Sequence, residues 1–195
     1  MARSPTKGKG RQRILEVAAQ SFAAHGYAGT SLSQVARDAG VTQPLVHHHF
    51  SSKEGLWRAV VDEHLSDLPE VDAAFASIDD PREVVLELTK RFVSLSARRP
   101  TLARIVAREG ASGGPRLDYL VENYIGVRLR ALEAGLARGR AEGWIDAAID
   151  PQLLILFILG GGAHLFDIPA IADGVFGIDV AAPETADRFA ALVLR

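Results

Sequence analysis

The sequence predicts an all-α protein with a small N-terminal helical domain and a larger C-terminal one. Apolar residues recur at helical spacing along most of the chain, and the breaks fall at glycine, proline and helix-capping residues. No stretch alternates apolar and polar residues for long enough to indicate a strand. Because 48% of the 195 residues are hydrophobic and 24% are charged, the chain can bury a core and is neither disordered nor fibrous.

Four helices are expected in the first 65 residues. Gly26 ends the first of them, because glycine adopts the left-handed backbone conformation at little cost. Ser31, with Gln34 three residues later, forms a capping pattern for the second helix. Thr42 caps the third, which carries Pro44 in its first turn, where a missing N–H matters little. The expected ranges are 10–25, 31–38, 42–49 and 54–65.

The C-terminal part is expected to hold longer helices. Residues 69–80 are acidic and alanine-rich with weak periodicity, which indicates a connection between the two parts. Residues 167–183 are expected to form a loose stretch before the last helix. The expected helices span residues 81–98, 101–109, 117–142, 151–166 and 184–194.

The formal net charge of −2 conceals an uneven distribution. Residues 1–58 hold eight Lys and Arg against three Asp and Glu, a charge of +5. The rest of the chain holds 14 basic against 21 acidic residues, a charge of −7. A basic N-terminal part suits a polyanion such as a nucleic acid, which the acidic remainder would repel.

The composition argues against several classes of protein. The absence of cysteine excludes disulfides, thiol nucleophiles and cysteine zinc sites. The N-terminus lacks the apolar stretch of a secretory signal, and the most hydrophobic run, residues 153–163, is shorter than the roughly 20 residues that span a bilayer. We therefore expect a cytoplasmic protein without a membrane segment.

No catalytic residue, metal or cofactor is expected either. The sequence contains no His-Glu-x-x-His zinc pattern, no Gly-x-Ser-x-Gly elbow and no phosphate loop. The histidine run at 47–49 does not change this, because successive helix residues point about 100° apart and cannot converge on one ion.

Residues 31–50 have the length and spacing of a helix-turn-helix, whose second helix enters the major groove of DNA. Gly40 lies in the turn, where it permits a tight crossing, and Ala36 lets the two helices approach closely. The pattern alone leaves the function open, because three-helix packing also occurs in proteins that do not bind DNA.

A more specific pattern covers residues 13–56. It combines a Gly-Tyr pair after the first helix, a Thr-Ser start to the second, an Ala-Gly-Val turn, a His-Phe end to the third and Ser-Lys-Glu at the start of the fourth. In these features the chain resembles the N-terminal domain of TetR-family regulators. The resemblance implies a homodimer with a ligand pocket in each subunit. The two subunits would join through the last two long helices. The implied division is a basic flexible tail at 1–10, a DNA-binding domain at 11–56 and a ligand-binding and dimerisation domain at 57–195.

The resemblance also places the expected DNA contacts. Gln43 can pair with adenine, and Leu45 can meet the methyl group of thymine. Two positions depart from the family pattern: His47 stands where tyrosine is usual, and Ser33 where arginine is frequent. Base-edge contacts are expected from Thr42, Gln43, Leu45 and His48, and phosphate contacts from Thr30 or Ser31, His47 and Lys53.

In the C-terminal domain, polar residues on otherwise apolar helix faces are candidates for effector binding, although for each of them the structural role is the simpler explanation. The same holds for the expected subunit interface at 153–166, which an intramolecular core would also explain. Gly160, Gly161 and Gly162 would let helices approach closely there, and Phe189, Leu192 and Val193 would complete the interface. The effector candidates are Phe92, Leu95, Ile105, Glu109, Tyr119, Leu120, Asn123 and Tyr124.

The sequence therefore predicts a repressor that binds a palindromic double-stranded DNA operator as a homodimer and is released by an unidentified small molecule. The fourth helix, 54–65, is the expected lever between the two domains. The alternatives are an architectural DNA-binding protein without a ligand, an all-α enzyme or carrier with a helix-turn-helix-like head, and a sensor that has lost DNA binding.

Overall fold

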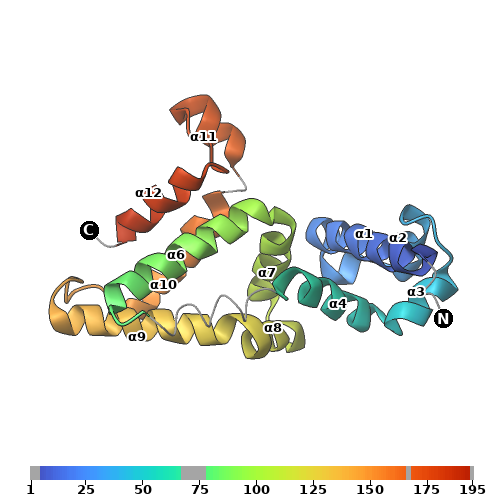
Figure 1. Cartoon of the computed structure of the whole chain (residues 1–195), viewed down its shortest axis with the longest axis horizontal. Helices are drawn as coiled ribbons and strands as arrows, with labels where there is room; N and C mark the ends of the chain where they lie inside the picture. Colours follow the sequence, from blue (N-terminus) through green and yellow to red (C-terminus); the bar gives the residue numbers. More distant parts are fainter. Residues whose placement is uncertain (1–4, 67–77, 166–167, 194–195) are drawn as a thin grey trace.

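The computed structural model describes residues 5–66, 78–165 and 168–193, without the side chains of 5–8 and 193. These residues form helices and no strand, so the all-α prediction is confirmed. Helices α1 to α4 form a head at one end of the elongated molecule, and the later helices form the body (Figure 1). The head comprises α1 (Pro5–Gly29), α2 (Leu32–Asp38), α3 (Gln43–Phe50) and α4 (Lys53–Leu65). The body comprises α6 (Pro81–Arg98), α7 (Pro100–Ser112), α8 (Pro115–Leu120), the π-helical η1 (Val121–Ile125), α9 (Gly126–Glu142), α10 (Pro151–His164), α11 (Pro169–Phe176) and α12 (Pro183–Val193).

Helix α1 is longer than the sequence predicts at both ends. It begins at Pro5, so most of the predicted flexible tail is helical. Gly26 adopts a φ of 71° and breaks the regular geometry there, as predicted, but the chain resumes helical turns as far as Gly29. The kink therefore redirects the chain toward α2 without ending the helical segment.

The turn between α2 and α3 has the geometry that the sequence predicts. Gly40 has a φ of 66°, in the left-handed region that favours glycine. The Val41 N–H donates to the Ala36 carbonyl at 2.9 Å, which closes the turn. The Ser31 hydroxyl accepts from the Gln34 N–H at 3.1 Å and caps α2 as expected, whereas the Thr42 side chain makes no capping bond to α3.

Helix α4 begins directly against the end of α3, and this close approach requires a glycine. A Cβ atom at Gly55 would lie 2.2 Å from the Phe50 carbonyl oxygen, a contact that no side chain can make. The Ser52 hydroxyl accepts from the Gly55 N–H at 2.9 Å and caps α4. The direction in which α4 leaves the head is therefore fixed where it meets α3.

The loose stretch predicted at 167–183 contains a helix, so that prediction is wrong in part. Pro169 lies in the first turn of α11, where proline is favoured, and Gly177 ends the helix with a φ of 63°. The Gly177 N–H donates to the Asp173 carbonyl at 2.8 Å. Both signals are visible in the sequence, but an eight-residue apolar segment has too few turns to show helical periodicity.

One hydrophobic core continues from the head into the body. Phe22 of α1 and Trp57 of α4 belong to the same buried cluster as Ile105 of α7 and Leu120 of α8. We call this cluster the shared core. A second buried cluster joins α6, α9 and α10 around Leu136, and α12 packs along α6. The head is therefore packed onto α7 and α8 rather than tethered to them.

No single helix in the described ranges is long and apolar enough to cross a membrane. Helices α10 and α11 meet that criterion only together, as a pair bent by 81°.

Candidate nucleic-acid interface and the contacts behind it

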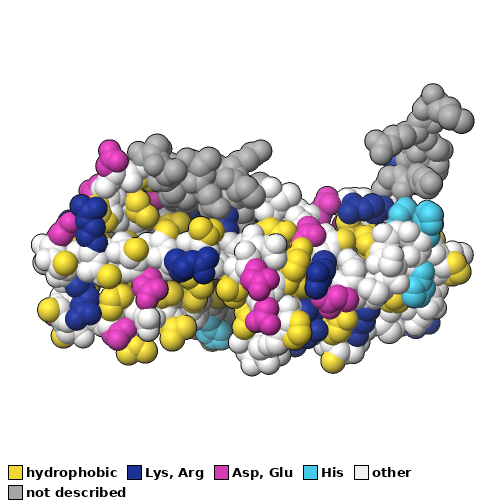
Figure 2. Space-filling view, turned by 90° about the horizontal axis from the view of Figure 1, so that it is seen from below, with side chains coloured by type: hydrophobic (Ala, Val, Ile, Leu, Met, Phe, Trp, Pro, Cys, Tyr) yellow, Lys and Arg dark blue, Asp and Glu magenta, His cyan; other side chains and the backbone are white. Residues whose placement is uncertain are grey.

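The outer face of α3 carries most of the residues predicted to contact DNA. Val46 and Phe50 point into the shared core and hold the helix against the head. The opposite side is accessible: Thr42, Gln43, His47 and His48 are exposed and Leu45 is half-buried. Figure 2 shows histidine side chains gathered on the surface at this end of the molecule. Five of the eight predicted contact residues thus lie on the accessible side of α3 or at its N-terminal end.

Ser31 is also exposed, at the start of α2. Its hydroxyl caps the helix and lies 3.2 Å from the Ser33 hydroxyl. The neighbouring Thr30 is different, since only 2% of it is exposed. The Thr30 hydroxyl donates to the Gly26 carbonyl at 2.9 Å and lies 3.1 Å from the Ser21 hydroxyl. The expectation that Thr30 contacts a phosphate is therefore corrected: its side chain bridges the kink of α1 to the start of α2.

Lys53, predicted to bind a phosphate, is half-buried at the start of α4. Its ammonium group donates to the Ala28 carbonyl at 3.2 Å and lies 4.5 Å from the centre of the Tyr27 ring. Burial, together with the nearby positive charge of Arg116, lowers the pKa of Lys53. This bond ties α4 to the end of α1, and the phosphate contact stays a prediction, because the Ala28 carbonyl uses one of the three N–H donors of the ammonium group.

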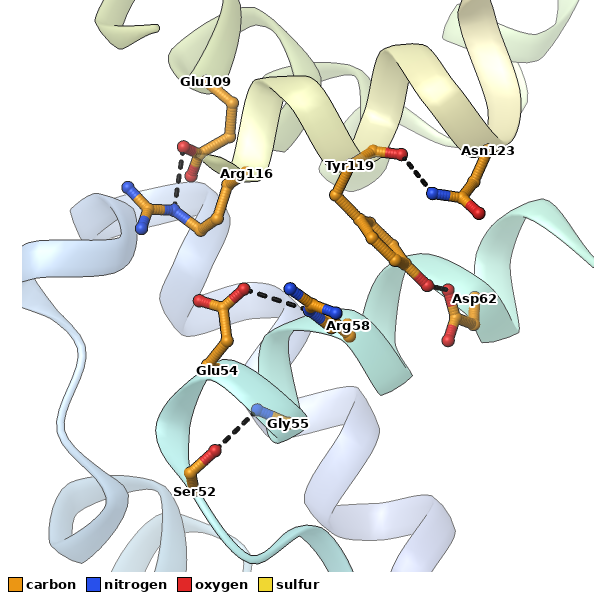
Figure 3. Close-up of polar contacts among 9 residues, drawn as sticks. All are labelled: Ser52, Glu54, Gly55, Arg58, Asp62, Glu109, Arg116, Tyr119 and Asn123. Atoms are coloured by element: carbon orange, nitrogen blue, oxygen red, sulfur yellow. Dashed lines mark hydrogen bonds and ion pairs between the residues drawn. The ribbon is translucent and has the colours of Figure 1, made fainter. Parts of the chain in front are cut away.

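Behind the interface, α4 is joined to the body through Asp62. The hydroxyl groups of Tyr119 and Tyr124 both donate to its Oδ1 atom, at 2.7 and 2.6 Å (Figure 3 draws the Tyr119 bond). Burial and the hydrogen bond to the Asp62 carboxylate raise the pKa of both tyrosines, so their hydroxyls stay protonated and continue to donate. The Arg58 guanidinium lies 4.6 Å from the centre of the Tyr119 ring. A single carboxylate on α4 thus holds both α8 and η1.

A second set of contacts joins the end of α1 to α7 and α8. Glu109 is buried and pairs with Arg116 at 2.9 Å, as Figure 3 shows. Arg116 in turn stacks 3.9 Å from the centre of the Tyr27 ring in α1. Arg108 of α7 donates to the carbonyl groups of Ala23 and Ala24, at 3.0 and 2.9 Å. Reasoning from the sequence missed these arginines, because periodicity does not reveal which exposed cation meets another element.

Neither of the two cavities described below, lined by residues within the described ranges, gathers the eight effector candidates. Ile105 and Leu120 are buried in the shared core, while Glu109, Tyr119 and Tyr124 make the contacts just described. Asn123 is exposed, and its side-chain amide donates to the Tyr119 carbonyl. Phe92 packs against the other two clusters of the body, and Leu95 is half-buried on α6. Cavities of about 300 and 200 Å³ are both lined by other residues.

An apolar surface lies on α10, where the sequence predicts a subunit interface. Leu153, Leu156 and Phe157 are each more than 60% exposed, and a Cβ atom at Gly160 would meet nothing within 4 Å. These four positions repeat at helical spacing and therefore share one face, which we call the α10 face. Leu192 of α12 is exposed as well.

The other described residues of the predicted interface, Gly161, Gly162 and Phe189, do not lie on the α10 face. A Cβ atom at Gly161 would lie 3.4 Å from the half-buried Phe189 ring, and one at Gly162 would lie 2.7 Å from Phe92. These contacts are within the chain: Phe189 packs against α10 of its own subunit, and its place in the subunit interface stays a prediction. Phe166 and the side chain of Val193 lie outside the described residues.

Comparison with known proteins agrees with this arrangement of head and body. Residues 14–60 match the family described as bacterial regulatory proteins, tetR family, and residues 81–195 match the tetracyclin repressor-like C-terminal domain. The chain belongs to the TetR family. It is therefore a DNA-binding transcriptional regulator, with the family's DNA-binding segment in the head and its C-terminal domain in the body.

Individual TetR-family proteins are similar over most of their length. The chain is 32% identical over 155 residues to RaaS, an HTH-type transcriptional regulatory protein of Mycobacterium tuberculosis, covering 78% of this chain and 68% of RaaS. It is 30% identical over 171 residues to the HTH-type transcriptional regulator RutR of Escherichia coli, covering 86% of this chain and 78% of RutR. An all-α enzyme or carrier is not favoured, because these relatives are transcriptional regulators.

Solved structures of transcriptional regulators share the fold. HlyIIR, a hemolysin II transcriptional regulator, superimposes with a TM-score of 0.70 at 18% identity, over 97% of this chain and 99% of that one. FadR from Bacillus subtilis, in complex with stearoyl-CoA, gives 0.65 at 19% identity, over 94% and 97%.

Proposed function

We propose that two copies of this chain bind a two-fold symmetric DNA operator in the cytoplasm and repress transcription until a small molecule binds the body. Each copy presents α3 to one half-site. The regulator acts by binding rather than by catalysis. The division into a head that reads DNA and a body that binds the effector and the second subunit is part of this proposal.

The observation that carries the proposal is the two-sided character of α3. Its inward side chains, Val46 and Phe50, fix the helix in the head, while Gln43, His47 and His48 are exposed. An eight-residue helix with a rigid inner side and a polar outer side can enter the major groove without unfolding any part of the head. The net charge of +5 over residues 1–58 favours approach to the phosphates.

The α10 face supports the dimer. It exposes large apolar side chains on a helix whose other side is buried in the body, which is costly in water unless a partner covers them. When the same face of two copies packs against itself, the result is a closed two-fold dimer. Such a dimer gives two α3 helices related by the same two-fold axis as a palindromic operator.

Effector release requires that DNA and the small molecule favour different positions of the head. The bonds from Asp62 to Tyr119 and Tyr124 support α4 as the element that connects the body to the head. FadR, which has the same fold, was solved in complex with stearoyl-CoA, and we propose that the body of this chain also binds a small molecule.

Selection of binding sites from random duplexes tests the proposed reading face. The unmodified protein should select an inverted repeat, and Gln43→Ala should lose preference at one position of each half-site, because a bidentate contact to adenine contributes about 1–3 kcal/mol of discrimination. Gln20→Ala is the matched control, since Gln20 is an exposed glutamine on α1 that bonds Thr101 at 3.4 Å. An unchanged consensus for Gln43→Ala would remove Gln43 from the interface.

A further inference from the structure

A cavity of about 300 Å³ lies where the head meets the body, between α1, α7 and the end of α10. It is separate from the outer face of α3 and from the residues predicted for the effector. Among the described residues, its lining comprises Arg104, Arg108 and five small apolar residues: Ala23, Pro100, Ala103, Ala107 and Ala163.

The wall that α7 gives to this cavity is a single helix face. Residues 100, 103, 104, 107 and 108 line the cavity and follow the spacing of three and four that places side chains on one side of a helix. The opposite side of α7 is buried in the shared core. The described lining of the cavity therefore lies on packed helices.

Arg108 places a positive charge at this cavity. Its Nε and Nη2 atoms donate to the Ala23 and Ala24 carbonyl groups, which are neutral, and Nη1 is not used in either bond. No carboxylate within residues 5–66, 78–165 and 168–193 forms an ion pair with Arg108. A planar carboxylate accepts two parallel hydrogen bonds from a guanidinium group, so pairing with Arg108 would use Nη1 together with Nη2, which now donates to the Ala24 carbonyl.

We propose that this cavity binds a small organic carboxylate with a flat apolar body, and that binding there weakens the hold on the operator. The carboxylate pairs with Arg108, and the apolar part packs against the alanine methyl groups. A cavity of about 150 Å³ holds a benzene molecule, so this cavity has room for a two-ring acid.

The coupling to DNA follows from the bonds that Arg108 already makes. When a carboxylate takes the Nη2 donor from the Ala24 carbonyl group, the tie between the end of α1 and α7 is weakened. The head then gains freedom relative to the body. This part rests on the proposed function and names the chemical class of its effector, whereas the binding step can be tested without DNA.

The lining offers a direct probe, because four of its residues are alanines. Protein labelled with ¹³C at alanine methyl groups is titrated with 2-naphthoate and, in parallel, with the neutral 2-naphthamide. We expect the methyl signals of Ala23, Ala103, Ala107 and Ala163 to shift with millimolar or stronger affinity for the acid, and at least about tenfold weaker affinity for the amide. The methyl signal of Ala186, which lines the separate 200 Å³ cavity, should not move.

Two variants distinguish the effect of the Arg108 charge from that of the cavity volume. Arg108→Gln should weaken naphthoate binding about tenfold or more, because a charged hydrogen-bond pair is lost. Ala103→Leu should do the same by filling the cavity while leaving Arg108 in place. Arg138→Gln, which removes an exposed arginine of α9 paired with Glu142, should leave the titration unchanged.

Different results would overturn the anion site and the coupling to DNA. If the four methyl signals stay fixed at millimolar naphthoate, or if the amide binds equally well, the anion site is wrong. If naphthoate binds but does not lower operator affinity by at least about fivefold, the coupling to DNA is wrong. If the protein binds no operator at all, the proposed function fails, but the titration still decides whether the cavity binds the acid.

Discussion

Replacing Phe157 by aspartate is expected to turn the dimer into monomers and to lower operator affinity by at least about 100-fold. Phe157 is 67% exposed in the single chain and lies in the middle of the α10 face. In a two-fold interface the substitution occurs twice, so two carboxylates would be buried without a cationic partner. The monomer would then hold only one half-site, and the contacts of the second α3 would be lost.

Sedimentation of Phe157→Asp and its operator titration, both at the same protein concentration as the unmodified chain, measure this effect. Val127→Asp is the matched control, because Val127 is 54% exposed on α9 and not on the α10 face. The control should remain dimeric and keep its operator affinity. A Phe157→Asp protein that sediments as the same dimer would show that a different surface joins the subunits.

Trp57→Ala is expected to lower the free energy of unfolding by about 3–5 kcal/mol. Trp57 is completely buried in α4 and belongs to the core that also contains Ile105 and Leu120. Removal of its ring would leave a large void between head and body. Because the core is shared, the head and the α7–α8 region should lose stability in one transition rather than in two.

Urea denaturation followed by far-ultraviolet circular dichroism measures this loss, and Trp57→Phe serves as the control. The indole Nε1 atom of Trp57 is buried and has no hydrogen-bond partner among the described residues. Phenylalanine removes that unsatisfied group and keeps most of the apolar volume, so its cost should be well below that of alanine. A loss under about 1 kcal/mol for Trp57→Ala, or a head that unfolds separately, would contradict the shared core.

Local signals in the sequence predict the head well because each of them is a property of one turn. The capping bond of Ser31 and the left-handed Gly40 are decided by residues within a few positions of each other. The accessible side of α3 follows from the two apolar positions that hold its inner side, Val46 and Phe50. The same local reasoning placed Thr30 at the surface, because a hydroxyl before a helix can cap it or be buried, and spacing does not distinguish these outcomes.

The body is harder to predict because its polar residues find partners on distant segments. Tyr119 and Tyr124 stand out on an apolar helix, which suggested a ligand pocket, but their partner is Asp62, 57 and 62 residues away in the chain. Nothing in the pattern around Asp62 indicates that it accepts two tyrosine hydroxyls. The cavity at Arg108 was missed for a related reason, since it is formed by alanines from three helices.

Methylation interference on a selected operator tests most directly whether two α3 helices lie in the major groove. Dimethyl sulfate modifies the N7 atom of guanine, which faces that groove. We expect methylation to block binding at two inverted patches whose centres are about 10 base pairs, or a multiple of one helical turn, apart. A single patch, or binding that is indifferent to methylation at N7, would contradict a dimer that reads DNA with the outer face of α3.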